Sequence, residues 1–198
     1  MTQFYLSTDA VLNTTDILLN GTHVIAGLAA GTASSGSTTI TIPSGSASGS
    51  YYFFAKADAG NAVSETQENN NTKIKLVAIG PDLIVSSVFV TSPVTAGSQT
   101  SVTDTVTNQG GATTGTSVTR FYLSANITLD ANDVLLPESR AVPGLAVGAS
   151  SSGTTLVTIP PGTAPGAYYV LAKADADGSV SESVETNNAA PRGIQVIN

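Results

Sequence analysis

The chain repeats itself at a fixed distance along the sequence. The tetrapeptide Phe-Tyr-Leu-Ser at Phe4 recurs at Phe121, which is an offset of 117 residues (121 − 4 = 117). The same offset continues without a gap, and 35 of the 68 positions in residues 4–71 are identical to their partners in residues 121–188. Self-similarity of this extent predicts two copies of one module rather than a single large domain.

The boundary between the copies is marked by a turn. Gly80-Pro81-Asp82 closes the first copy and precedes a new apolar pattern that starts at Leu83. We therefore predict two domains, a shortened module at 1–79 and a complete module at 80–198. By the repeat offset, the first module lacks the counterpart of residues 81–119, which are predicted to contain two strands and the start of a third.

Composition and residue alternation predict a chain of short strands. Nineteen glycines and nine prolines oppose helices, and the many Thr and Val residues favour strands. The predicted fold class is all-β, with tandem immunoglobulin-like or fibronectin III-like β-sandwiches. Alternation and turn residues predict a turn at 93–97 and seven strands in the complete copy, at residues 82–91, 99–108, 117–125, 134–142, 152–159, 167–175 and 189–197.

Charge and composition exclude several classes of function. The net charge is −7 with only seven Lys and Arg residues, so we expect no nucleic-acid partner. The absence of cysteine excludes disulfides and thiolate metal sites. No stretch reaches the roughly 18 apolar residues of a membrane span, and residues 1–3 lead into a strand without a signal-peptide pattern. We expect no membrane insertion within this chain and no targeting segment in it.

Several short motifs occur together along the chain. They are Pro81-Asp82-Leu83, Asn108-Gln-Gly, Arg120-Phe-Tyr-Leu-Ser, Asp133-Val-Leu-Leu, Gly166-Ala-Tyr-Tyr, Ala172-Lys-Ala-Asp and Glu185-Thr-Asn-Asn. This combination resembles the CARDB domain, the cell-adhesion-related domain found in bacteria, over the whole of residues 81–198 and from the third strand onward in 4–79. The resemblance implies a seven-stranded sandwich from a repetitive surface protein, with an extracellular or cell-surface location.

The sequence does not offer the residues of an active site. The only histidine is His23, and the second copy has Arg140 at that position. The Ser-His-Asp and Cys-His arrangements of hydrolases are not supported, because the chain has no second histidine and no cysteine. We therefore predict that the protein is not an enzyme and that His23 is a solvent-exposed strand residue.

Carboxylates gather in two loops that recur in both copies. Ca²⁺ takes six to eight oxygen ligands from carboxylates, amides and backbone carbonyls, and such loops can supply them. The candidate ligands are Asp130, Asp133, Asp175 and Asp177, provided that the two loops meet in space. The alternative is turn chemistry, in which Asp and Asn bond to their own backbone. The remaining loop residues of this kind are Asn132, Glu182, Glu185, Asn187 and Asn188, and in the first copy Asn13, Asp16, Asp58, Glu65, Glu68, Asn70 and Asn71.

Two structural roles are also predicted. Asp104 has the strand parity of apolar neighbours, and Arg120 precedes the apolar run of the third strand, so we expect a cross-strand ion pair between Asp104 and Arg120. Tyr51 and Tyr168 follow a glycine at the start of the sixth strand and are predicted to be tyrosine corners, with the ring inward and the hydroxyl bonded to backbone. Their neighbours Tyr52 and Tyr169 could stack on sugars.

The shortened first module admits two explanations. In one, the chain is a segment of a longer array, cut within a module. In the other, strands of a neighbouring molecule complete the first module by β-strand addition and produce dimers or filaments. The predicted function is a structural or adhesive repeat segment of an extracellular prokaryotic surface protein, whose partners are other copies of itself or neighbouring repeats. The alternative is a calcium- or carbohydrate-binding module of a secreted protein.

Overall fold

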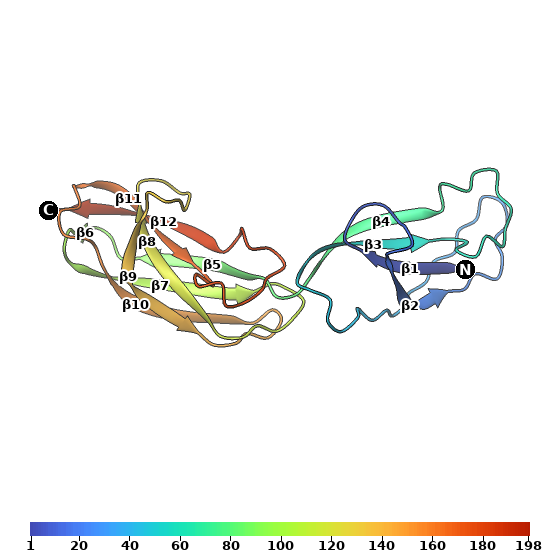
Figure 1. Cartoon of the computed structure of the whole chain (residues 1–198). Coiled ribbons are helices and arrows are strands. Elements are labelled where there is room, and N and C mark those ends of the chain that lie inside the picture. Colours follow the sequence, from blue (N-terminus) through green and yellow to red (C-terminus); the bar gives the residue numbers. More distant parts are fainter. The chain divides into compact units, whose positions relative to one another are not determined.

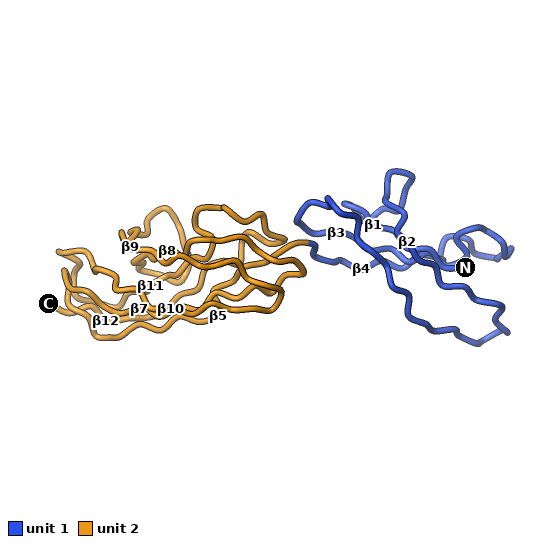
Figure 2. The backbone as a smooth tube through the Cα atoms, turned by 90° about the horizontal axis from the view of Figure 1, so that it is seen from below, with its two compact units in different colours: residues 1–79 blue, residues 80–198 orange.

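A computed structural model describes all residues from 1 to 198 and contains strands but no helices. The predicted all-β class is therefore confirmed, and no helix capable of crossing a membrane is present. The chain separates into two compact units, Met1–Ile79 (unit 1) and Gly80–Asn198 (unit 2), which are coloured separately in Figure 2.

Unit 2 is a sandwich of two antiparallel sheets (Figure 1). One sheet has the order β10-β7-β5 and the other has the order β6-β12-β11-β8-β9, in which the short β6 pairs in parallel with β12. The edges of the two sheets lie side by side, because β9 packs beside β10 and β12 beside β5. The strands are β5 (Leu83–Val90), β6 (Val94–Thr95), β7 (Gln99–Asn108), β8 (Ser117–Ser124), β9 (Val134–Val142), β10 (Ser150–Thr158), β11 (Gly166–Lys173) and β12 (Ala189–Ile197).

Strand alternation places the core of unit 2 between these sheets. Successive side chains of a strand point to opposite faces, so every second residue can be buried. In β7, Val102, Asp104 and Val106 are fully buried, and in β8 the buried residues include Phe121 and Leu123. Phe121 lies opposite Ala172 of β11 in the strand register and shares its face. The apolar face of each sheet is therefore read directly from the sequence.

One short strand was not predicted. Val94 and Thr95 form β6 within the segment 93–97, which was predicted to be only a turn. They lie beside Val196 and Ile197 at the end of β12. The Ala96 N–H donates to the Ile197 carbonyl at 3.0 Å, so backbone hydrogen bonding to an adjacent strand end, rather than local sequence, creates β6.

Unit 1 has one sheet instead of two. Its order is β2-β1-β3-β4, and these strands occupy the positions of β9, β8, β11 and β12 in the repeat. Residues 1–79 contain no counterpart of β5 or β7. The strands are β1 (Thr2–Ser7), β2 (Ile17–His23), β3 (Gly49–Lys56) and β4 (Thr72–Ile79).

The counterpart of β10 is present in the sequence of unit 1 but does not form a strand. Residues 33–41 align with β10 and read ASSGSTTIT against SSSGTTLVT. In unit 2 the only hydrogen-bonding partner of β10 is β7. Since unit 1 has no β7, residues 33–41 have no ladder to join and are irregular. A strand-forming sequence therefore stays unpaired because its partner is missing.

The missing sheet also leaves apolar side chains of unit 1 in solvent. Val63 and Val180 occupy the same repeat position, yet Val63 is 59% exposed and Val180 only 6%. Leu28 is 52% exposed and its counterpart Leu145 only 5%. The buried apolar residues of unit 1 are Leu6, Leu19 and Phe54. We call the side of the unit 1 sheet that corresponds to the core side of β8 and β11 the open face.

Candidate functional site

The first strand of unit 2 is held by a glutamate from the loop between β11 and β12. The Leu83 N–H donates to Glu182 Oε2 at 2.7 Å, and Asn188 Nδ2 donates to Glu182 Oε1 at 3.1 Å. Glu182 is buried, with 4% of its surface exposed. A hydrogen bond from a backbone N–H to a carboxylate is stronger than one between neutral groups. Glu182 therefore fixes the start of β5 to a loop that lies 99 residues further along the chain.

Neighbouring polar groups extend this contact to the residues before β5. The Ser183 N–H donates to the Pro81 carbonyl at 2.8 Å. The Asp82 carboxylate accepts Gln109 Nε2 and Asn187 Nδ2, both at 2.9 Å. We call the group formed by Glu182, Ser183, Asn187 and Asn188 the clasp, because together these residues hold the Pro81-Asp82-Leu83 segment.

The loop that carries the clasp is shaped by Asp175. Its carboxylate accepts the N–H groups of Ser179 and Val180, each at 3.1 Å, and the Ser179 hydroxyl at 2.9 Å. Asp175 has a positive φ of 42°, which aspartate tolerates better than most residues. Aspartate side chains commonly bond to backbone a few residues ahead and so define a loop. Asp175 thus acts as the support of the loop.

Three carboxylates of this loop lie close together. Oxygen atoms of Asp175, Glu182 and Glu185 are all within 4.8 Å of one another. Burial raises the pKa of Glu182 to about 7, against the opposing hydrogen bond from the Leu83 N–H, and the negative charges of Glu185 and Asp175 raise it further. A carboxyl group in such a position holds its proton close to neutral pH.

Unit 1 contains the same loop with the same internal bonds. Asp58 accepts the N–H groups of Ala62 and Val63 at 3.0 and 2.9 Å, as Asp175 does in unit 2. Asn71 Nδ2 donates to Glu65 Oε2 at 2.6 Å, as Asn188 does to Glu182. Glu65 is exposed, since no strand covers it. The counterpart of the clasp loop is therefore folded in unit 1, although no strand is bound to it.

A buried ion pair joins the two sheets of unit 2. Arg140 of β9 donates from Nε to Asp104 Oδ1 at 2.9 Å and from Nη2 to Asp104 Oδ2 at 2.5 Å. The side chain of Asp104 is fully buried and that of Arg140 is 10% exposed. Arg140 also donates from Nη1 to the Ser151 hydroxyl at 3.2 Å. The guanidinium therefore binds the Asp104 carboxylate in a bidentate arrangement and also donates to Ser151.

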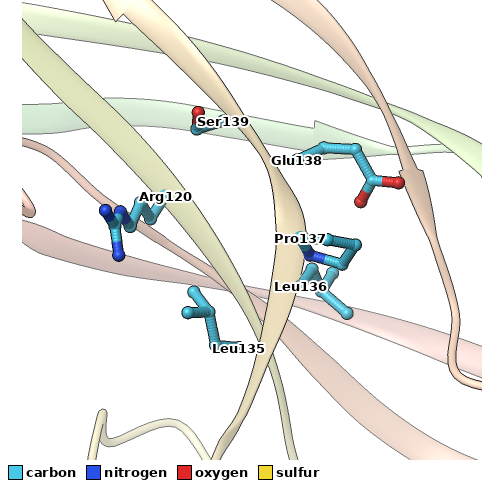
Figure 3. Close-up of a pocket in the computed structure, with 6 residues that line it drawn as sticks. All are labelled: Arg120, Leu135, Leu136, Pro137, Glu138 and Ser139. Atoms are coloured by element: carbon cyan, nitrogen blue, oxygen red, sulfur yellow. The ribbon is translucent and has the colours of Figure 1, made fainter.

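The predicted pair of Asp104 with Arg120 is wrong. Arg120 is exposed, while its neighbours Thr119 and Phe121 on β8 are buried. Because side chains alternate along a strand, Arg120 points to the outer face and away from the core that contains Asp104. Figure 3 shows Arg120 in a shallow outer pocket beside Leu135, with Glu138 extending on the other side of β9.

A glycine makes the path of Arg140 possible. Gly153 lies opposite Asp104 in the register between β10 and β7, and a Cβ atom on Gly153 would lie 2.5 Å from Arg140 Cδ. The arginine side chain therefore crosses the β10 backbone at the one residue without a side chain. The repeat preserves this feature, because a Cβ atom on Gly36 would lie 2.9 Å from His23 Nε2 in unit 1.

The four nominated calcium ligands do not form one group. The loop of Asp130 is closed by its own bonds: the Asp130 N–H donates to Asp133 Oδ2 at 2.8 Å and the Asn132 N–H to Asp130 Oδ1 at 2.7 Å. Asp177 is exposed. Of the four, only Asp175 belongs to the cluster of three carboxylates. Other residues of the two loops do line one pocket together with Lys173, namely 127–129, Glu185, Thr186, Asn188 and Ala189.

The two tyrosines that were predicted to be corners both lie in half-buried positions. The Tyr51 hydroxyl donates to the Ala47 carbonyl at 3.0 Å, four residues upstream, which is the contact of a tyrosine corner. Tyr168 packs against the core cluster of unit 2. Both residues therefore contribute to structure at the beginning of their strands.

Sequence reasoning missed the roles of Glu182 and Arg140. A usable signal for Glu182 was its exact recurrence as Glu65 together with Asp58, Glu68 and Asn71, which shows that the loop is kept as a unit. No local signal identified Arg140, since its contact depends on how strand edges from two sheets meet. The clasp and the ion pair are thus the features that only the structure reveals.

A family model matches most of the chain. A family model described as CARDB matches residues 1–75 and again residues 80–192. The search of curated proteins found no match.

Solved structures give similar but distant neighbours. The crystal structure of the CARDB domain of the PF1109 protein from Pyrococcus furiosus, in complex with di-metal ions, is 24% identical, with a TM-score of 0.45, and the match covers 60% of this chain and 90% of that one. A domain of a putative cell surface protein from Methanosarcina acetivorans is 20% identical, with a TM-score of 0.45 and coverages of 61% and 95%. A β-glucosidase from Listeria innocua is 17% identical, with a TM-score of 0.38, and only 17% of that chain is covered, against 62% of this one. At these TM-scores the neighbours carry no argument about ligands or chemistry.

Proposed function

This chain belongs to the CARDB family, and we propose that it is a structural, adhesive segment of an extracellular surface protein built from repeated modules. The observation that carries the proposal is the exposure of Leu28 and Val63, whose counterparts in unit 2 are buried, beside a clasp loop that is already formed. An exposed apolar face on a sheet with an unpaired neighbouring segment is a site for another chain. We propose that strands from another chain complete unit 1 and thereby link modules into assemblies.

The surface of unit 2 supports a structural role. On the outer side of β7 and β10, hydroxyl groups pair across the strands, each pair separated by 2.8 Å. Cross-strand pairs of Thr and Ser stabilise a sheet without using charged groups. The outer side therefore forms a regular, uncharged ladder, which suits a spacer or an adhesive repeat. The pairs are Thr103 with Thr154, Thr105 with Ser152 and Thr107 with Ser150.

We also propose that this chain has no catalytic role. The imidazole of His23 lies over the backbone of Gly36 rather than beside a carboxylate or a nucleophile. The buried carboxylates Asp175 and Glu182 are bonded to backbone N–H groups. These side chains hold the structure, which is what a binding or spacer module requires.

Sedimentation equilibrium of the complete chain tests the proposed assembly. We expect self-association or capture of added strands that depends on the open face of unit 1. The Val63→Asp variant places a charge at the loop position that corresponds to the core residue Val180, at a side chain that is already exposed, so the monomer should fold normally while association is lost. The matched control is Val11→Asp, at a side chain that is 65% exposed in a different loop. A monomer at all concentrations that also captures no strand would contradict strand complementation.

A second candidate function is calcium binding at Asp175, Glu182 and Glu185. The observation that favours it is the buried Asn188 Oδ1, which accepts no hydrogen bond although Asn188 borders the carboxylates. Carboxylate and amide oxygens are the ligands that Ca²⁺ prefers. Thermal melting with and without millimolar calcium tests it, with Glu185→Gln as the variant because Glu185 is exposed. An unchanged melting temperature would contradict it.

A further inference from the structure

We propose that the open face of unit 1 takes a β-hairpin with the pattern of β5–β7 from another chain of the same repeat family, and that His23 pairs with the buried carboxylate of that hairpin. This inference rests on the proposed strand complementation and names the donor and the residue that selects it. It also makes the capture dependent on pH.

The apolar face of unit 1 matches the face that β5 and β7 cover in unit 2. The side chains of Phe121, Leu123 and Ala172 are buried in unit 2, and the same residue types stand in unit 1 at Phe4, Leu6 and Ala55. Within unit 1, Leu6 is already buried and Phe4 and Ala55 are half-buried. The exposed apolar side chains are those of Leu28 and Val63, which line one pocket. The strand register repeats as well, because Phe4 lies opposite Ala55 just as Phe121 lies opposite Ala172. Unit 2 therefore shows what covers a face of this composition and register.

The clasp of unit 1 selects the beginning of the donor strand. In unit 2, Glu182 accepts the N–H of Leu83 and Ser183 donates to the carbonyl of Pro81. In unit 1, Glu65 has the same support from Asn71 and is exposed. A Pro-Asp-Leu segment would meet the same acceptor, so the donor would be fixed in register as well as in orientation.

Strand β4 of unit 1 carries a cation at the repeat position of a cation–π contact in unit 2. The Arg192 guanidinium of β12 lies 5.7 Å from the ring centroid of Phe89 on β5. The same repeat position in unit 1 is Lys75 of β4, which is exposed. Lysine also interacts favourably with an aromatic face. A donor strand with an aromatic residue at the place of Phe89 therefore fits this edge.

His23 stands at the repeat position of Arg140, whose guanidinium carries a permanent positive charge in unit 2. In unit 2 the buried Asp104 is neutralised by Arg140, which crosses Gly153. In unit 1 His23 lies against Gly36 at the same repeat positions. A guanidinium is always charged, whereas a histidine is charged only in acidic solution. A hairpin carrying an aspartate would therefore be captured most tightly in acidic solution.

Few other charges act on His23. Strand β1, which pairs with β2, carries no acidic or basic side chain, and its titratable group is Tyr5 opposite Leu18. Residues 24–48, which include the segment over which His23 lies, have no charged residue. The remaining cations are the α-amino group next to Thr2, which is the register partner of His23, and Lys56, which lies opposite Gln3 on β3. Asp58 carries the nearby carboxylate of unit 1, and it interacts with both of these cations, so the donor supplies a carboxylate directed at His23 itself.

The test uses the complete chain and a synthetic peptide of residues 80–111, which contains β5 and β7. Binding is measured by isothermal titration calorimetry at about pH 5.5 and about pH 8, on either side of the ordinary histidine pKa. We expect about tenfold tighter binding at the lower pH, because an unpaired buried carboxylate opposes capture. The Val63→Asp chain should not bind the peptide, and the Val11→Asp chain should bind it normally.

Variants separate the two parts of the inference. His23→Arg should bind equally well at both pH values, and an Asp104→Asn peptide should lose the pH dependence with the unaltered chain. Circular dichroism of each variant verifies that the sheets are retained. If the peptide binds without pH dependence and His23→Gln changes nothing, the role of His23 is refuted while strand capture stands. If the peptide does not bind at either pH, both the inference and the proposed strand complementation fail.

Discussion

The guanidinium of Arg140 and the carboxylate of Asp104 connect the edge of one sheet of unit 2 to the interior of the other. Asp104 is on the middle strand of its sheet, between β5 and β10, and Arg140 is on the edge strand β9. A fully buried carboxylate is stable in the charged form only when its partner is present with good geometry. The packing of the two sheets therefore depends on this one ion pair.

Loss of Arg140 alone should be costly. In Arg140→Met the Asp104 carboxylate would remain buried without its charge partner, so we expect the free energy of unfolding of unit 2 to fall by about 3–5 kcal/mol. Urea unfolding at neutral pH measures this. The double variant Arg140→Met/Asp104→Leu removes both charges and should recover most of the loss. A double variant that is no more stable than Arg140→Met would contradict this account of the pair.

Even the methyl group of an alanine at position 153 should destabilise unit 2. In Gly153→Ala the new Cβ would overlap Arg140 Cδ, so the guanidinium must shift from Asp104 or the strand must move. We expect a loss of about 1–3 kcal/mol, as for other overpacked sites. Gly111→Ala is the matched control, since a Cβ at Gly111 would contact nothing within 4 Å. Equal urea midpoints for the two variants would show that the crossing is not tight.

The sequence defined the strands better than it defined the contacts between them. The predicted strand at 99–108 has the same bounds as β7, because alternation is a local signal. Arg120 was predicted to be the partner of Asp104 because it adjoins the apolar residues of its strand. Neighbouring side chains of a strand point to opposite faces, so this adjacency places Arg120 on the outer face. The correct partner, Arg140, is brought close by sheet-edge packing, which has no local pattern.

The candidate site shows the same limit. Turn-forming carboxylates were recognised in the loop that begins at Asp175, and Asp175 does bond to backbone. The bond from the Leu83 N–H to Glu182 joins residues 99 positions apart, so the sequence could show only that the glutamate recurs at Glu65. Likewise, residues 33–41 have a strand sequence but no partner in unit 1, which is a property of the sheet and not of the segment.

Glu182 should make the stability of unit 2 depend on pH. Its pKa is about 7 in the folded chain against 4.5 as the ordinary value, so the folded state binds the proton more tightly. The resulting stabilisation is fully present below pH 4.5 and is lost as the pH rises through 7. Glu182→Gln keeps an acceptor for the Leu83 N–H and cannot ionise. Melting temperatures at several pH values should therefore decline less between pH 4.5 and 8 in the variant than in the unaltered chain, and parallel profiles would refute this.

The repeat supplies its own control for burial. Val63 and Val180 stand at the same position of their modules, but only Val180 contributes to a core. Val180→Asp would place a charge among apolar side chains and should destabilise unit 2 by several kcal/mol. Val63→Asp should change the stability of the isolated chain by no more than about 0.5 kcal/mol, as is usual for exposed positions.

Urea unfolding followed by tyrosine fluorescence and circular dichroism compares these two variants. If a donor hairpin is bound to unit 1, the contrast should disappear, because Val63 would then occupy a core like that of Val180. The Val63→Asp chain would consequently lose the stabilisation that the donor gives to the unaltered chain. Equal sensitivity of the two positions in the chain without a donor would mean that the open face is already covered, and the assignment of unit 1 as an acceptor would have to be abandoned.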